Sequence, residues 1–144
     1  MAGGRSAARI ARPSATVRPG PLAPSATTVP SDIQGSAHLV ARQDGVVSGV
    51  RAAQHAFDLV DASLEVDWFV SDGATVAPGT RIATVTGSAA SILTAERTAL
   101  NLLTHLSGVA TATRAWVDAV AGTPAEIRDT RKTLPGLRAL EKAA

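Results

Sequence analysis

A basic, hydroxyl-rich segment near the end of the chain carries the residue types that can bind an anion. It spans residues 128–138 and includes the consecutive Thr130, Arg131 and Lys132. A guanidinium and an ammonium suit a carboxylate or a phosphate, and the amides of a following helix N-terminus would add to them. The segment is expected to follow a strand over residues 125–130, and ligands in α/β folds bind at such loops. The residues alone leave two interpretations open, an anion site or a solvated surface pair.

Arg97 is a second cationic candidate. It follows Glu96, and the pair flanks an apolar stripe that includes Leu93 and Leu100. A surface ion pair without function, worth about 0 to 1 kcal/mol, explains the two charges as well as a binding site does. Both interpretations of Arg97 stay open at this level.

Several kinds of chemistry are excluded by composition. The chain has no cysteine, so it has no thiolate nucleophile, no disulfide and no cysteine-ligated zinc. Its histidines, His38, His55 and His105, are scattered without the spacing of a metal site. We therefore assign no catalytic side chain and no metal ligand within this chain.

The net charge of +2 conceals an uneven distribution. Residues 1–31 hold four arginines and no acid, residues 32–126 hold five arginines against ten acids, and residues 127–144 hold five basic residues against two acids. Binding to nucleic acid needs basic residues gathered on one face, usually with aromatic residues for single strands. We expect no nucleic-acid partner.

The first 31 residues are expected to form a disordered tail. They contain five of the eight prolines and few large apolar side chains, so they cannot bury enough surface to offset their conformational entropy. The chain has neither an apolar run of about 18 residues nor a signal-peptide core. We expect no membrane partner and a cytoplasmic location.

Beyond the tail, the pattern predicts an α+β fold of short antiparallel strands. Residues 36–50 alternate and predict two short strands joined by a turn at Asp44 and Gly45. A helix over 51–63 and a strand over 64–70 follow. The segment 72–82 resembles the hammerhead turn of biotinyl and lipoyl carriers. Because the lysine those carriers need is absent there, we expect a structural turn.

The longest helical pattern begins near Ser91 and ends before Gly122. Gly108 lies in its middle and predicts a kink or a break, since glycine costs a helix about 1 kcal/mol relative to alanine. A further helix is expected from Leu137. The apolar stripe of the long helix is predicted to contain Leu93, Leu100, Leu103, Ala110, Val117 and Val120, widened by Leu106, Val109 and Trp116.

Three blocks of sequence, residues 95–101, 106–111 and 129–142, closely resemble the quinolinate phosphoribosyltransferase family, also called nicotinate-nucleotide pyrophosphorylase, carboxylating. Residues 36–87 agree more loosely. The resemblance implies an N-terminal α/β sandwich with a long helix, followed by the first strand and helix of a truncated α/β barrel. The implied domains are the tail over 1–31, the sandwich over 32–107 and the start of the barrel over 108–144.

The resemblance also implies a function. The family is a pentosyltransferase of NAD biosynthesis that joins quinolinate to phosphoribosyl pyrophosphate, with magnesium, and releases pyrophosphate and carbon dioxide to give nicotinate mononucleotide. It works as a homodimer with shared active sites. By the family pattern Arg97 reaches across the dimer to the quinolinate of the neighbouring subunit, while Thr130, Arg131 and Lys132 form the first barrel loop and contact the quinolinate carboxylates.

The departures from the family pattern set further expectations. The later basic loops for substrate and the acidic groups for magnesium have no counterpart in this chain. We therefore expect the N-terminal part of such an enzyme, shortened by a broken gene or an incomplete gene model and inactive by itself. The alternatives are a non-catalytic dimerisation or partner-binding module, or a related nicotinate-specific or molybdenum-cluster phosphoribosyltransferase.

Overall fold

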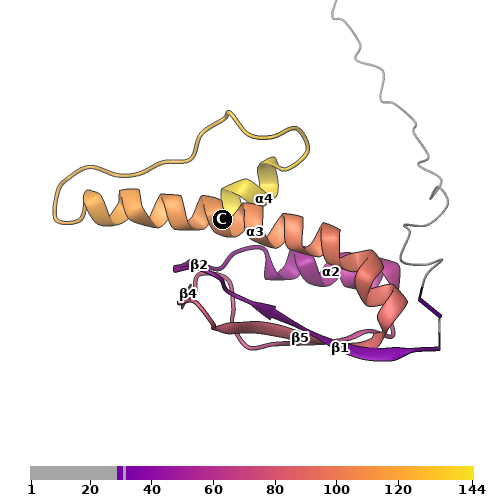
Figure 1. Ribbon diagram of the computed structural model, residues 1–144. Coiled ribbons are helices and arrows are strands. Elements are labelled where there is room, and N and C mark those ends of the chain that lie inside the picture. Colours follow the sequence, from indigo (N-terminus) through magenta and orange to yellow (C-terminus); the bar gives the residue numbers. More distant parts are fainter. Residues whose placement is uncertain (1–28, 31) are drawn as a thin grey trace, which may run out of the picture.

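The computed structural model describes residues 29–30 and 32–144, so the tail predicted to be disordered over 1–31 falls almost wholly outside the described residues. The fold is α+β, as predicted (Figure 1). Its elements in chain order are β1 Gln34–Val40, β2 Gly45–Val46, α2 Val50–Val60, β3 Glu65–Trp68, β4 Thr75–Val76, β5 Arg81–Ser88, α3 Ala89–Ala119 and α4 Arg138–Ala143.

The strands form two separate antiparallel sheets. One has the order β1-β5-β3, and the other consists of β2 and β4. The predicted hairpin over residues 36–50 is therefore wrong, because its two strands pair with different partners. The chain leaves the first sheet at Val40, where the register shifts, and Ala41 then exchanges hydrogen bonds with Gly79 and Thr80. These bonds take the place of pairing with β2.

Two helices, α2 and α3, cover one face of the larger sheet (Figure 1). The alternation along β5 explains this arrangement, since Ala83 and Val85 are buried while Thr84 and Thr86 lie on the other face. Phe57 of α2 is almost fully buried between the layers. The core cluster consists of Leu39, Val47, Ala53, Ala56, Phe57, Leu64, Val76, Ala83, Val85, Ile92, Ala95, Ala99 and Leu103.

The buried face of α3 agrees with the predicted stripe at Leu103, Leu106 and Ala110 and differs from it elsewhere. Residues recur on it at helical spacings of three and four, and the small side chains of Ala95 and Ala99 are wholly inaccessible. Leu93, Trp116 and Val117 are exposed instead. The prediction favoured large side chains and so left out Ala95 and Ala99, the two positions where α3 packs so closely on its neighbours that a small side chain is needed. The buried residues are Ile92, Ala95, Ala99, Leu103, Leu106 and Ala110.

The helix α3 runs unbroken through Gly108, where a kink or break was predicted. Gly108 is exposed, and a Cβ placed on it would meet no other atom. Packing at Leu106 and Ala110, one on each side, holds the helix together. The intrinsic cost of one glycine, about 1 kcal/mol, is smaller than what burial of a single leucine contributes.

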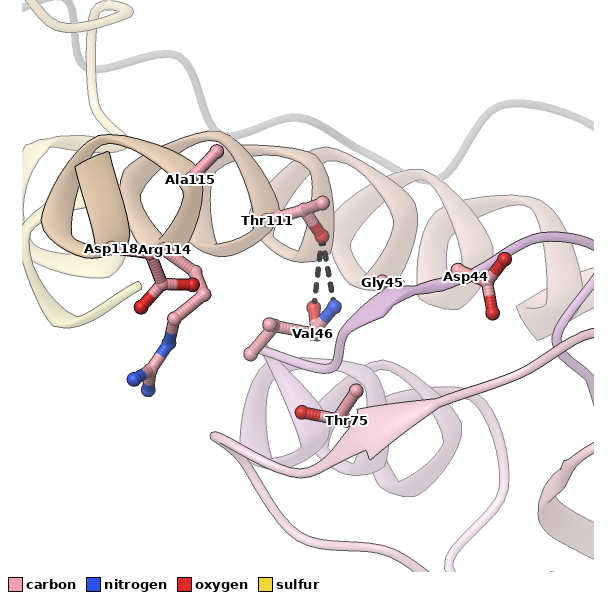
Figure 2. Close-up of a pocket in the computed structure, with 8 residues that line it drawn as sticks. All are labelled: Asp44, Gly45, Val46, Thr75, Thr111, Arg114, Ala115 and Asp118. Carbon is pink, nitrogen blue, oxygen red and sulfur yellow. Dashed lines mark hydrogen bonds between the residues drawn. The ribbon is translucent and has the colours of Figure 1, made fainter.

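Two hydroxyls of α3 accept hydrogen bonds from backbone N–H groups in and beside β2, as the carbonyls of a neighbouring strand would. The Thr111 hydroxyl accepts the Val46 N–H at 2.9 Å, and the Ser107 hydroxyl accepts the Ser48 N–H at 3.0 Å. Figure 2 shows the contact between Thr111 and Val46. Because buried backbone amides must find partners, these two hydrogen bonds fix the distance between α3 and the small sheet.

The segment 72–82 is a structural turn, as predicted. The Asp72 carboxylate accepts the Val50 N–H at 2.9 Å at the start of α2, where Gly49 offers no side-chain cap. The Gly73 N–H donates to the Val47 carbonyl at 2.8 Å. The turn thus caps a helix and closes the small sheet.

The predicted strand over residues 125–130 is wrong, because these residues form no regular element and are all exposed. A strand needs partners for its amides and carbonyls, and no strand pairs with this segment among the described residues. The predicted helix after it is present as α4, which packs against α3.

Gly49 gives a stability prediction. Its φ is +95°, and an added Cβ would lie 2.6 Å from Cδ1 of Leu106, which is 1% exposed. Gly49→Ala should destabilise the fold by about 2 to 4 kcal/mol, since left-handed strain and overpacking add. Gly73 has φ +87° and nothing within 4 Å, so Gly73→Ala should cost only about 1 kcal/mol. Equal losses in urea unfolding would show that the contact with Leu106 is unimportant.

Candidate functional site

The basic loop, defined as residues 129–134, is shaped by contacts to its own backbone. The Thr130 hydroxyl accepts the Lys132 N–H at 3.0 Å, which makes a tight turn around Arg131. From α4, the Arg138 guanidinium donates to the Arg131 carbonyl at 3.4 Å. Three of the four predicted substrate-binding residues, Thr130, Arg131 and Lys132, therefore lie on one turn.

The cationic groups of this turn carry no counter-charge within the described part of the chain. Arg131 and Lys132 are exposed, and no carboxylate lies within ion-pair distance of either among the residues described. Arg128, just before the loop, pairs with Glu126 at 3.0 Å. Arg131 therefore offers a planar fork of N–H donors, and Lys132 a compact positive charge, to an anion that approaches from solvent.

Two acidic residues hold the loop in place, and sequence reasoning missed both. Asp129 pairs with Lys142 at 2.9 Å, and Glu141 contacts Nε2 of His105 at 2.8 Å and accepts the Leu134 N–H at 3.2 Å. Their partners lie 7, 13 and 36 positions away in sequence. The only sequence signal was the location of Glu141 in the first turn of a helix, where a carboxylate is favoured.

The structure does not bring Arg97 to the basic loop. Arg97 is exposed on α3, eight residues before His105, or about 12 Å along a helix axis. Glu96 does not form an ion pair with it among the described residues. The interpretation of Arg97 and Glu96 as a surface ion pair is therefore unsupported, and a role across a dimer stays a prediction.

A separate open hollow of about 480 Å³ lies between β2, β4 and the second half of α3 (Figure 2). Arg114 and Asp118 come from the helix, and Asp44 comes from the opposite wall. It contains none of the predicted substrate-binding residues. Arg114 extends away from the Thr111 contact in Figure 2. The hollow is lined by Asp44, Gly45, Val46, Thr75, Thr111, Arg114, Ala115 and Asp118.

Neither a metal cluster nor a membrane span was found in the part of the chain that the structure describes. No three histidine, cysteine or acidic side chains gather there in a way that would hold a metal ion. No helix of that part is both long enough and apolar enough to cross a bilayer. The expected magnesium therefore has no fitting donor set among these residues.

Family models match nearly all of the described chain. Residues 23–107 match the quinolinate phosphoribosyl transferase N-terminal domain, and residues 109–144 match the C-terminal domain of the same family. The chain belongs to the quinolinate phosphoribosyl transferase family. This confirms the resemblance carried by the three sequence blocks. The two matches meet inside α3, and the division into units at 32–107 and 108–144 stays a prediction.

Individual relatives agree with the family. A nicotinate-nucleotide pyrophosphorylase [carboxylating] of Mycobacterium leprae is 51% identical over 119 residues, which are 81% of this chain and 42% of the relative. A chloroplastic relative of the same name from rice, Oryza sativa subsp. japonica, is 47% identical over 117 residues, 81% of this chain and 31% of the relative. This family member therefore spans about a third to two fifths of the length of the curated relatives that it matches.

Solved structures of the family share the fold. NadC from Streptococcus pyogenes superimposes with a TM-score of 0.77 at 36% identity, over 81% of this chain and 41% of that one. The nicotinate-nucleotide pyrophosphorylase from Francisella tularensis gives a TM-score of 0.78 at 33% identity, over 83% and 43%. The sandwich with its long helix is thus the arrangement found in the quinolinate phosphoribosyl transferases.

The ion pair between Asp129 and Lys142 gives a pH prediction. The hydrogen bond and the charge of Lys142 lower the pKa of Asp129 from its ordinary value. A lowered carboxyl pKa stabilises the folded state above the unfolded pKa of about 3.9, and this contribution is lost as the pH falls through the lower folded value. Lys142→Met should raise the Asp129 pKa toward the ordinary value in a carboxyl ¹³C titration.

The matched control for this titration is Lys132→Met, because no ion pair of Lys132 is found among the described residues. It removes the same charge from the same region and should leave the Asp129 midpoint nearly unchanged. Equal midpoints in the two variants would mean that general positive charge, and not the contact with Lys142, sets the pKa of Asp129.

Proposed function

We propose that this chain serves phosphoribosyl transfer from phosphoribosyl pyrophosphate to quinolinate, as part of a pentosyltransferase of NAD biosynthesis. The products are nicotinate mononucleotide, pyrophosphate and carbon dioxide. The observation that carries the proposal is the turn of Thr130, Arg131 and Lys132, whose cations have no counter-charge among the described residues, in a chain that belongs to this family. The names of the relatives, pyrophosphorylase [carboxylating], favour quinolinate over nicotinate as the acceptor.

The chemistry of the proposed reaction suits such a loop. Quinolinate is a pyridine with two carboxylates, so its binding calls for cations and hydrogen-bond donors. Arg131 offers a planar fork for one carboxylate, Lys132 a second charge and Thr130 a hydroxyl. The ring nitrogen displaces pyrophosphate at the ribose carbon, the 2-carboxylate leaves as carbon dioxide, and the electron pair left on the ring carbon takes up a proton from water. Positioning and electrostatics serve such a reaction, and the protein need not supply a nucleophile.

Magnesium is proposed as the cofactor on the family resemblance alone. It would neutralise the pyrophosphate group when bound. The described residues do not gather a ligand set for it. We further propose a cytoplasmic location, although relatives from plants carry chloroplastic and mitochondrial names.

A chimeric enzyme tests the substrate assignment. The matched 119 residues of the Mycobacterium leprae relative are replaced by the corresponding part of this chain, and conversion of quinolinate and phosphoribosyl pyrophosphate is measured. The chimera should turn over, and Arg131→Ala should raise KM for quinolinate at least about tenfold, because a charged hydrogen bond contributes about 1.5 to 3 kcal/mol. The 144-residue chain by itself is expected to be inactive.

The matched control in the chimera is Arg128→Ala. Arg128 is more exposed than its partner Glu126, and their pair lies outside the turn. This variant should keep KM within about twofold, since exposed ion pairs contribute little. An active chimera in which both arginine variants behave alike would refute the assignment of Arg131 to substrate.

We also propose a homodimer in which Arg97 serves the active site of the neighbouring subunit. Two chimeras, Arg97→Ala and Arg131→Ala, should each lose most of their activity when quinolinate is kept below the wild-type KM. When they are co-expressed, mixed dimers have one site with both defects and one intact site, so about a quarter of the wild-type activity should return if a two-fold dimer forms at random. No recovery in mixed dimers would place Arg97 in the site of its own subunit.

A further inference from the structure

Glu141 stands out because both of its carboxylate oxygens are engaged by different parts of the chain. One oxygen lies 2.8 Å from Nε2 of His105 on α3, and the other accepts the Leu134 N–H at 3.2 Å at the end of the basic loop. The side chain of Glu141 is only 11% exposed, and that of His105 is 35% exposed. A partly sheltered carboxylate with two donors is a strong connection between two segments.

The neighbours of Glu141 on α4 act on the same loop. Lys142 pairs with Asp129 where the loop begins, and Arg138 donates to the Arg131 carbonyl in its middle. Together with Glu141 at Leu134, they hold the loop at its start, its centre and its end. Of these three side chains, Glu141 alone makes a hydrogen bond to α3 within the described structure.

We propose that Glu141 is a positioning residue for the substrate site, which fixes the basic loop against α3 through His105. This inference rests on the proposed function, because it treats Arg131 and Lys132 as groups that bind the substrate carboxylates. Glu141 does not touch the substrate in this proposal. It limits how far the two cations can move, so that less conformational entropy is lost when the dianion binds.

The contact also defines the state of His105. A carboxylate can only accept hydrogen bonds, so Nε2 of His105 must carry the proton that faces Glu141. Both the neutral ring protonated on Nε2 and the imidazolium satisfy this condition. In Glu141→Gln the amide oxygen can still accept the Leu134 N–H, while the amide NH₂ requires His105 to turn an unprotonated nitrogen toward it. The glutamine variant therefore keeps the loop bond and weakens the link to α3.

The test uses the complete 144-residue chain and two readouts, amide hydrogen exchange at Leu134 and binding of quinolinate followed by NMR shifts of the loop amides. Glu141→Ala should speed exchange at Leu134 about tenfold and weaken quinolinate binding about tenfold, as expected for loss of one charged hydrogen bond. Glu141→Gln should lie between Glu141→Ala and the wild type in both. The control Glu126→Ala, which removes an exposed carboxylate paired with Arg128, should change neither.

A second variant approaches the contact from the other side. His105→Ala should weaken quinolinate binding. The double variant with Glu141→Ala should bind about as well as Glu141→Ala alone, because Glu141→Ala already removes the contact between Glu141 and His105. The ¹⁵N signals of the His105 ring should show a protonated Nε2 in the wild type and should change in Glu141→Gln. Circular dichroism identifies any variant that has lost its helices, and the remaining variants then decide the matter.

The outcomes separate this inference from the proposed function. Equal quinolinate affinity of the wild type and Glu141→Ala would overturn the positioning role, as would unchanged exchange at Leu134. If the wild type binds no quinolinate and exchange at Leu134 still rises in Glu141→Ala, the anchoring by Glu141 is supported and the proposed substrate is what fails. Additive effects of the two alanine variants would overturn the route through His105.

Discussion

The close packing of α3 against α2 and the larger sheet is the constraint on which the rest of the structure depends. Ala95 and Ala99 are fully buried on the inner face of the helix, and larger side chains at these positions would push its neighbours away. Once the helix lies this close, the hydroxyls of Ser107 and Thr111 reach the backbone beside the small sheet. One helix thus organises both sheets.

The same helix carries the functional part of the chain beyond the sandwich. Its buried face ends at Ala110, and residues 112–119 are all exposed. His105 lies just before this point and is joined to α4 through Glu141. The helix α4 in turn contacts the basic loop at three places. The core fixes which face of α3 is buried, and this orientation of α3 therefore sets the position of α4 and of the loop.

Much of the fold follows from the sequence because local patterns fix it. The alternation of β5 and the spacing of Ala53 and Phe57 on α2 each depend on a few neighbouring residues. The hairpin over residues 36–50 failed because pairing is decided by distant partners, here β4 and β5. The strand over 125–130 failed for the same reason, since no partner strand is found among the described residues.

The candidate site was likewise predicted only in part from the sequence. The residues that bear its charge, Arg131 and Lys132, were found from their types and from the family blocks, whereas Glu141 and Asp129 were not. Residue types indicate which groups can meet an anion, but the supporting bonds join positions that only the folded chain brings together. The structure of a single chain does not test the predicted role of Arg97, because that role depends on a second subunit.

The charge of the C-terminal segment now has a structural explanation. This segment has five basic residues against two acids, and ion pairs of the two acids with the cations of the loop would neutralise its charge. Instead Asp129 pairs with Lys142 and Glu141 with His105, so neither faces Arg131 or Lys132. The two acids hold the loop in place but stay away from its cations, so the loop keeps a positive potential that attracts a dianion. Support of the loop and the proposed binding of substrate therefore use separate charged residues.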